Sequence, residues 1–254
     1  MGNGMNLTED VEEFARKVGA DIVGVASAER LEGAPKGHRP SDLLPGSRSV
    51  VVAGIRMLEA VVDSLPSPIY QFMGYAALNN ELSHIAYHTA KHIEDLGYLA
   101  LPTPPTRDYD MKTITGTFSH IHAAIEAGLG ERGLNGLFLT PEYGPRVRLV
   151  SVLTVAPLTP TRPLKQEVCT RCGICVKACP MKAIGEDGRV DPVRCLAQST
   201  LYTKEPEEEF KRQLESLKQI PHEIFVARSL VGRNVLPPLC GICVKVCPIG
   251  RPKP

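Results

Sequence analysis

The 254-residue sequence has no tryptophan, few aromatic residues (5%) and a formal net charge of only +1. With so little net charge, the chain has no overall field that would attract nucleic acid or an anionic membrane. No apolar run approaches the roughly 20 residues that cross a bilayer. Residues 1–14 are acidic and lack the basic and apolar regions of a signal peptide or a twin-arginine signal. We therefore expect a cytoplasmic protein with no membrane partner and no nucleic-acid partner.

Cysteine is absent from the first 168 residues, whereas eight cysteines follow. A secreted disulfide scaffold would spread its cysteines along a short chain behind a signal peptide, which is not the pattern here. The cysteines form a group with the spacing C-x2-C-x2-C-x3-C-P, an isolated residue, and a group with the spacing C-x2-C-x3-C-P. In chain order they are Cys169, Cys172, Cys175, Cys179, Cys195, Cys240, Cys243 and Cys247.

The first group has the spacing of bacterial ferredoxins, in which three thiolates bind one [4Fe-4S] cluster and the fourth binds the other. A cluster with irons at tetrahedral corners needs a tightly turning loop, and Gly173 allows the backbone to approach it closely. Zinc sites or free thiols are the alternatives, but zinc usually takes two well-separated C-x2-C pairs. Following the crossed ferredoxin pattern, we predict one cluster on Cys169, Cys172, Cys175 and Cys247, and the other on Cys179, Cys195, Cys240 and Cys243.

Two clusters that share their loops predict a path for single electrons. Four cationic side chains lie among the predicted ligands, and they would attract an acidic electron donor such as ferredoxin or flavodoxin. Surface cations are also common without any partner, so this observation alone does not identify the donor. The four side chains are Arg171, Lys177, Lys182 and Lys245.

The region before the cysteines predicts a mixture of helices and strands. A capped helix is expected over residues 8–18, with Thr8 as its N-cap, and an amphipathic helix over 75–96. The sequence contains no internal repeat and no low-complexity tract. Further strands are predicted over 22–26, 49–55, 137–139 and 147–154, and further helices near 119–127 and 205–217.

Two patterns in this region match known motifs by spacing alone. The glycines between residues 128 and 136 follow a helix instead of a strand, so we exclude a dinucleotide-binding turn. His84, His88 and His92 are spaced four apart on a predicted helix. No glutamate is placed as in H-E-x-x-H, so we interpret these histidines as a solvated helix face.

Three segments of the chain resemble a known superfamily. They are LLPGSRSVVVAG, SHIHAAIEAGLGERGLNGLFLTPEYGPRVRLVSVLT and CGICVKVCPIG. In these segments the sequence is similar to the epoxyqueuosine reductase and reductive dehalogenase superfamily. The isolated Cys195 also matches the lone cluster ligand of that family. The resemblance covers about residues 8–250. It implies an α+β fold, with a nitroreductase-like α/β core over residues 1–160 and a ferredoxin-like domain with two [4Fe-4S] clusters over residues 161–254.

The resemblance also implies a function. In that family the core binds cobalamin, and the clusters reduce its cobalt to a nucleophilic low-valent state. We therefore expect an iron–sulfur oxidoreductase that passes low-potential electrons to a corrinoid and on to an organic substrate. The alternative is an electron-transfer protein that serves a partner enzyme or a corrinoid protein and has no substrate of its own. A nitroreductase-like core would also be able to bind FMN.

Candidate residues for this chemistry follow from the same resemblance. The catalytic aspartate motif of the epoxyqueuosine reductases has no match here, and the nearest proton-donor candidates are Asp108, Tyr109 and Asp110. The candidate corrinoid-binding residues lie in the second of the three similar segments. They are Ser119, His120, Gly128, Gly130, Gly133, Asn135, Thr140, Tyr143, Gly144 and Arg146.

Overall fold

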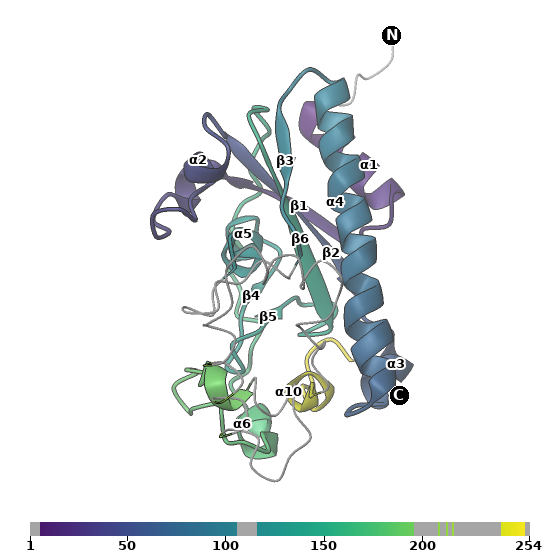
Figure 1. Cartoon of the computed structure of the whole chain (residues 1–254), viewed down its shortest axis with the longest axis vertical. Helices are drawn as coiled ribbons and strands as arrows, with labels where there is room; N and C mark the ends of the chain where they lie inside the picture. Colours follow the sequence, from purple (N-terminus) through teal and green to yellow (C-terminus); the bar gives the residue numbers. More distant parts are fainter. Residues whose placement is uncertain are drawn as a thin grey trace.

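A four-stranded antiparallel sheet with the strand order β1-β2-β6-β3 lies at the centre of the protein (Figure 1). The computed structural model describes residues 6–105, 116–195 and 240–251, together with Glu208, Arg212 and Glu215. The two central strands pair along their full length, and the shorter β3 lies at one edge. The strands are β1 (Ile22–Ser27), β2 (Ser49–Arg56), β3 (Ala100–Pro102) and β6 (Val147–Thr154).

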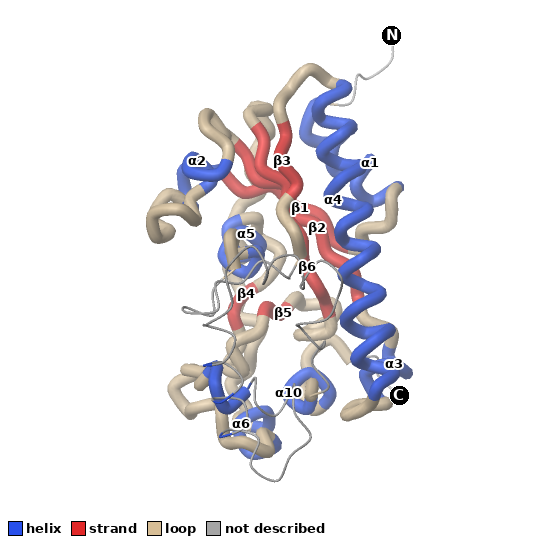
Figure 2. Tube along the Cα trace, in the orientation of Figure 1, coloured by secondary structure: helices blue, strands red, loops and turns tan. Residues whose placement is uncertain are grey.

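Helices cover both faces of this sheet (Figure 2). The helices α1 (Leu7–Lys17) and α4 (Leu78–Asp95) pack on one face, and α5 (His120–Glu126) packs on the other. Side chains of β2 alternate accordingly, with Val51 directed to the α1/α4 core and Val50 to the α5 core. Because both faces are buried, β2 reads as a continuous apolar run in the sequence.

The other elements are short and lie mostly at the end of the sheet where β2 ends and β6 begins. The pair of strands β4 and β5 forms a separate two-stranded sheet. The two cysteine-bearing helices, α6 and α10, lie close together below this end of the sheet (Figure 1). These elements are η1 (Ala28–Leu31), α2 (Pro40–Leu43), α3 (Glu59–Asp63), the π-helix η2 (Tyr70–Ala77), β4 (Glu131–Arg132), β5 (Phe138–Leu139), α6 (Ile174–Ala178) and α10 (Ile242–Lys245).

The first helix begins earlier than the sequence predicts. Asn6 is its N-cap, and the Asn6 side chain and Glu9 form a reciprocal capping box. The prediction of Thr8 as the N-cap is wrong, because the Thr8 hydroxyl instead accepts a hydrogen bond from the backbone N–H of Thr159, at 2.8 Å. The first turn of α1 therefore contacts the segment that follows β6.

The predicted helix over residues 75–96 is also longer and less regular than expected. It starts as a π-helix at Tyr70 and continues as α4 to Asp95.

Both strands of the central pair agree with the sequence pattern to within one residue at each end. The edge strand β3 and the short helix α3 were not predicted. The predicted helix over 205–217 lies outside the described residues, apart from three isolated positions.

No helix in the described ranges is both long enough and apolar enough to cross a membrane.

Candidate metal centre

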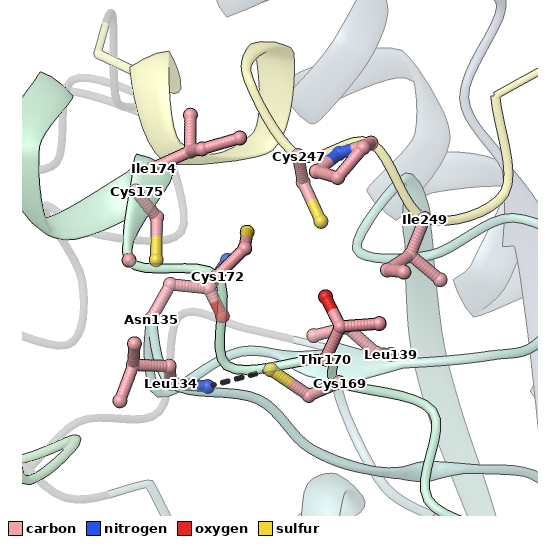
Figure 3. Close-up of a pocket in the computed structure, with 12 residues that line it drawn as sticks. Leu134, Asn135, Leu139, Cys169, Thr170, Cys172, Ile174, Cys175, Cys247 and Ile249 are labelled. Atoms are coloured by element: carbon pink, nitrogen blue, oxygen red, sulfur yellow. Dashed lines mark hydrogen bonds between the residues drawn. The ribbon is translucent and has the colours of Figure 1, made fainter.

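Four cysteine thiols from two distant segments surround one cavity (Figure 3). Cys169, Cys172 and Cys175 come from the loop before α6, and Cys247 comes from the turn after α10. The cavity has an empty volume of about 330 Å³, including space open to solvent. The structure thus places together the four residues that the crossed ferredoxin pattern assigns to one cluster. We call them thiol set one.

The loop that carries the first three of these cysteines turns tightly. Arg171 and Gly173 adopt left-handed backbone conformations, with φ angles of 51° and 72°. Gly173 is the N-cap of α6 and itself lines the cavity. A left-handed non-glycine residue such as Arg171 is uncommon and is held by its surroundings. The backbone is therefore shaped to wrap the cavity, as a loop around a cluster requires.

Backbone N–H groups point at two of the sulfurs. The amide of Leu134 donates to Sγ of Cys169 at 3.4 Å (Figure 3), and the amide of Ala183 donates to Sγ of Cys179 at 3.3 Å. In iron–sulfur proteins, hydrogen bonds to sulfur are one of the determinants of the reduction potential.

The other four cysteines are close enough to perturb one another. Burial raises the pKa of Cys243 to about 12, and the nearby thiols of Cys195 and Cys240 add to the shift. Desolvation by the surrounding chain likewise raises the pKa of Cys195 to about 11, and Cys240 and Cys179 raise it further. The four residues Cys179, Cys195, Cys240 and Cys243, which we call thiol set two, are thus electrostatic neighbours. Cys175 of set one also raises the pKa of Cys243, so the two sets adjoin.

The isolated Cys195 is positioned by a local cap. The Asp191 carboxylate accepts hydrogen bonds from the amides of Val193 and Arg194, at 3.0 and 3.1 Å. The Cys195 amide donates to the backbone carbonyl of Asp191 at 3.1 Å. A capped helical turn therefore presents this distant cysteine to set two.

The donor chemistry of both sets fits an iron–sulfur cluster better than zinc. Each set supplies four thiols that form no disulfide, and four thiolates are the ligands of one [4Fe-4S] cluster. A single zinc ion at about 2.3 Å from each sulfur would hold four sulfurs within about 3.8 Å of one another. Among the described residues, no group of three or more His, Cys, Asp or Glu side chains is compact enough to hold a single metal ion.

The turn between β5 and β6 forms the seat of the last cysteine. The Thr140 hydroxyl accepts from the Tyr143 amide at 2.9 Å, and Thr140 and Gly144 exchange backbone hydrogen bonds. A Cβ on Gly144 would lie 2.1 Å from the carbonyl oxygen of Ile249, and a Cβ on Gly250 would lie 2.3 Å from the amide nitrogen of Gly144. The two backbones therefore meet at a distance that only glycine allows.

A buried arginine completes this seat. Arg146 is 1% exposed, and its Nη1 donates to the carbonyls of Val244 and Cys247, at 3.3 and 3.0 Å. Nη2 donates to the carbonyl of Ile249. The Nε atom faces the Glu59 carboxylate at 3.5 Å, without hydrogen-bond geometry. Burial lowers the pKa of Arg146, and the Glu59 carboxylate opposes that shift.

Further contacts tie α10 to the core. The Lys245 ammonium donates to the carbonyls of Asp63 and Leu65, both at 2.8 Å, where α3 ends. Arg251 forms an ion pair with the Asp63 carboxylate at 3.3 Å. Val244 packs in a small core with Tyr70 and other side chains of α3 and η2. The second cysteine group therefore rests on α3 and the start of η2 through both polar and apolar contacts.

The predicted corrinoid-binding residues are largely occupied within the protein. Ser119 caps α5, and His120 is hydrogen bonded to the Ser151 hydroxyl at 2.9 Å and to the Pro104 carbonyl at 3.0 Å. Asn135 lines the cavity of thiol set one and accepts a hydrogen bond from the Leu137 amide at 3.1 Å.

The predicted glycines have packing roles. Added Cβ atoms on Gly128 and Gly130 would lie 2.2 and 2.0 Å from the backbone oxygens of Arg162 and Leu139, and one on Gly133 would lie 2.5 Å from the Leu139 side chain. These glycines thus allow two segments to pack closely. The candidate proton donors Asp108, Tyr109 and Asp110 lie outside the described residues.

The three histidines of α4 do not form one group. His84 and His88 are exposed and meet edge to face, with ring centroids 6.3 Å apart. His92 instead pairs with the Asp10 carboxylate at 3.1 Å and stacks on the Phe14 ring.

Comparison with known proteins agrees with the geometry of the thiols. Residues 168–222 match the model of a 4Fe-4S double cluster binding domain. The tetrachloroethene reductive dehalogenase of Sulfurospirillum multivorans is 28% identical over an alignment 220 positions long, which covers 73% of this chain and 42% of that protein. The epoxyqueuosine reductase of Bacillus subtilis is 24% identical over a gapped alignment 275 positions long, which covers 99% of this chain and 65% of that protein. The chain is therefore similar to members of the epoxyqueuosine reductase and reductive dehalogenase superfamily.

Solved structures of superfamily members share the fold. The epoxyqueuosine reductase of Streptococcus thermophilus superposes with a TM-score of 0.65 at 19% identity, over 98% of this chain and 67% of that chain. A reductive dehalogenase described as suggesting a mechanism for B12-dependent dehalogenation gives a TM-score of 0.57 at 19% identity, over 94% of this chain and 39% of that chain. The chain therefore has the mixed α/β fold of the superfamily and a double-cluster domain, and it spans less than two thirds of the curated relatives' length.

The signal that sequence reasoning missed is the role of Arg146 and of the turn before it. The motif TPEYGPR was noticed only as part of a family resemblance. Two features of this motif are a glycine with a left-handed backbone, Gly144, and a cation that follows a proline. Both features would suit the binding of another chain segment as well as the binding of a cofactor. Only the structure places Ile249 and Cys247 against it.

Proposed function

We propose that this protein is an iron–sulfur oxidoreductase that carries low-potential electrons, one at a time, through two adjoining [4Fe-4S] clusters to reduce an organic substrate. The observation that carries the proposal is the convergence of Cys247 with Cys169, Cys172 and Cys175 around one cavity. Four thiolates are the ligands that one [4Fe-4S] cluster takes, and each thiol set supplies four. The adjoining position of the second thiol set supports a continuous path.

The residues in this path have separate tasks. Thiol set one and thiol set two would hold the clusters, which supply one-electron redox chemistry. The amides of Leu134 and Ala183 donate hydrogen bonds to two of the sulfurs, which is one of the determinants of a cluster's reduction potential. The proposal also includes a nitroreductase-like core over residues 1–160 and a ferredoxin-like domain over residues 161–254.

The proposed acceptor class is a corrinoid, and its support comes from the relatives. One related dehalogenase is described with B12-dependent dehalogenation. The described residues of this chain do not themselves form a corrinoid site, since Ser119, His120, Gly144 and Arg146 are engaged in contacts within the protein. We therefore derive no step through cobalt, and corrinoid binding is a direct test of this part of the proposal.

The relatives' names define the reaction classes to test. Reduction of an epoxide to an alkene consumes two electrons and two protons and releases water. Replacement of a carbon-bound halogen by hydrogen consumes two electrons and one proton and releases halide. Either reaction needs two successive one-electron deliveries, for which ferredoxin or flavodoxin is the proposed donor. Asp108, Tyr109 and Asp110 remain the proposed proton donors.

The first experiment is anaerobic purification followed by iron, sulfide and cobalt analysis. We expect about eight irons and eight sulfides per chain, the content of two [4Fe-4S] clusters. Added cobalamin is expected to bind at about one per chain, as followed by its absorbance after gel filtration. Zinc or disulfides in place of iron would contradict the whole proposal. Iron without cobalamin binding would contradict only the corrinoid part.

Paired substitutions test the crossed ligand sets. We expect Cys169→Ser and Cys247→Ser to remove the same cluster and leave about four irons. Cys179→Ser and Cys195→Ser should remove the other cluster, with a different electron paramagnetic resonance spectrum for the one that remains. If Cys247→Ser behaved like Cys240→Ser, the crossed assignment would be wrong.

A second candidate is an electron-transfer protein that reduces a partner enzyme or a separate corrinoid protein. The commitment of the predicted corrinoid-binding residues to internal contacts favours it. Rapid reduction of an isolated corrinoid protein, without turnover of an epoxide or an organohalide by the protein alone, would identify this role. Bound FMN, released on denaturation and seen by its absorbance, would point to neither candidate.

A further inference from the structure

Two side chains of opposite charge contact the segments that carry the last and the first cysteine of thiol set one. Arg146, immediately before β6, contacts the segment that carries Cys247. Glu131, from β4, contacts the segment that carries Cys169. Glu131 therefore contacts the segment of the first cysteine of the set, and Arg146 contacts the segment of the last.

The Arg146 contacts are concentrated on the turn after α10. Its guanidinium donates to the carbonyls of Val244, Cys247 and Ile249, which lie before, at and after the cysteine. Arginine suits this task because its planar fork carries five donors and stays charged. A fully buried cation is expensive to maintain, and the Glu59 carboxylate at 3.5 Å is its only carboxylate partner among the described ion pairs.

The Glu131 contact is the counterpart on the first cysteine loop. Its Oε1 accepts hydrogen bonds from the amide of Val168, at 2.9 Å, and from the amide of Cys169. A carboxylate that accepts two backbone amides holds the backbone at the point where the loop begins. Its partly buried position keeps its charge less screened than that of a surface carboxylate.

We propose that Arg146 and Glu131 are positioning residues for the cluster on thiol set one, and that their charges set its reduction potential in opposite directions. This inference rests on the proposed two-cluster function. Reduction adds one electron to the cluster, converting [4Fe-4S]²⁺ to [4Fe-4S]⁺. A nearby buried cation stabilises the added negative charge and raises the potential, whereas a nearby carboxylate lowers it.

Three substitutions separate charge from geometry. Arg146→Gln removes the cation and most of the fork. Arg146→Lys keeps the cation but cannot donate to three carbonyls at once. Glu131→Gln removes the charge and keeps an oxygen that can accept from the same two amides. Lys91→Gln is the control, because Lys91 pairs with Asp95 on an exposed face of α4, toward the end remote from the cysteine helices (Figure 1).

The readout is a redox titration of the reconstituted protein with dithionite, followed by electron paramagnetic resonance, with iron counted in every sample. For one of the two clusters, we expect Arg146→Gln to shift the oxidised-to-reduced ratio at least tenfold toward the oxidised form, which corresponds to about 59 mV for one electron. Glu131→Gln should shift the same cluster toward the reduced form. Arg146→Lys should shift it less than Arg146→Gln, and Lys91→Gln should shift neither cluster.

The outcomes decide between the two parts of the inference. Loss of about four irons in Arg146→Gln supports positioning, and Glu131→Gln with Arg146→Lys then tests the charge effect. Unchanged potentials in Glu131→Gln, or equal shifts in Arg146→Lys and Arg146→Gln, would overturn the charge effect. Full iron retention and an unchanged potential in Arg146→Gln would overturn both. A wild-type protein without iron would instead refute the proposed function, so the two failures are distinguishable.

Discussion

Replacing Gly144 with alanine tests whether the turn between β5 and β6 is the seat of Cys247. Gly144 has a φ of +54°, and a Cβ there would lie 2.1 Å from the carbonyl oxygen of Ile249. The same carbonyl accepts a hydrogen bond from Arg146. The substitution therefore strains the backbone, creates an overlap and displaces a group that a buried cation needs.

The magnitude follows from these three effects. A left-handed conformation costs an alanine about 1–2 kcal/mol, and overpacking in a closed contact costs about 1–3 kcal/mol more. Loss of a hydrogen bond to a charged donor adds about 1.5–3 kcal/mol. The sum is comparable to the whole stability of a small domain, about 5–15 kcal/mol. The cheaper response is for the segment 247–250 to leave the turn, which removes Cys247 from its cluster.

The matched control is Gly97→Ala. Gly97 also has a positive φ, of +91°, but a Cβ there meets nothing within 4 Å. It therefore carries the backbone strain of about 1–2 kcal/mol without the overlap. Comparing the two variants isolates the contact between the turn and the last cysteine loop.

The assay is iron per chain together with the apparent midpoint temperature, measured anaerobically. Bound clusters break two-state unfolding, so the temperature is used only for comparison between variants. We expect Gly97→Ala to keep about eight irons and to lose several degrees, and Gly144→Ala to keep about four irons. If Gly144→Ala kept full iron and lost no more temperature than Gly97→Ala, the seat would have no role in holding Cys247.

Three further substitutions test other parts of the structure. Ile93→Ala opens a cavity between α4 and the sheet, because the Ile93 side chain is 0% exposed there. We expect the free energy of unfolding to fall by about 2–5 kcal/mol and the iron content to stay unchanged. Iron loss would contradict the separation of this core from the clusters. Lys245→Met removes two donated hydrogen bonds to the end of α3, so we expect about 1–3 kcal/mol less stability and earlier iron release on heating. Burial raises the pKa of Tyr70 to about 12, so its unfolded form, with a pKa near 10, ionises first. Relative to Tyr70→Phe, the wild type should lose stability as the pH rises from about 10 to about 12, by about 1.4 kcal/mol per pH unit; parallel pH profiles would refute this.

The sequence predicts the elements whose side chains alternate or repeat strongly. The buried strand β6 and the helix α5 agree closely with the pattern, because apolar spacing alone determines them. The capping residue of α1 was misplaced, since Asn6 and Thr8 are both good N-caps and only the contact of Thr8 with Thr159 distinguishes them. The edge strand β3 is three residues long and ends in proline, so it carries no periodic signal.

The candidate site shows the same division. The pairing of Cys247 with the first cysteine group follows from the ferredoxin spacing, because ligand spacing is fixed by the geometry of the cluster. The roles of Gly130 and Arg146 do not follow from the sequence. A glycine allows the backbone to approach a cofactor, but it equally allows the approach of another backbone, as Gly130 does with Leu139. The sequence alone does not distinguish the two cases. An arginine before a buried strand gives no indication of which carbonyls it will contact.

The distribution of cysteines among the apolar cores links cluster loss to one end of the molecule. The two cores that cover the faces of the sheet contain no cysteine among their described members. The two smaller cores, around Tyr70 and around Leu139, include Cys243 in one and Cys169 and Cys247 in the other. Removing the clusters should therefore loosen α6, α10 and their contacts with α3, while the sheet and its helices stay folded. Hydrogen exchange of the apo-protein would then show protection in β2 and β6 and none in α10, because metal binding contributes folding free energy only where its ligands lie.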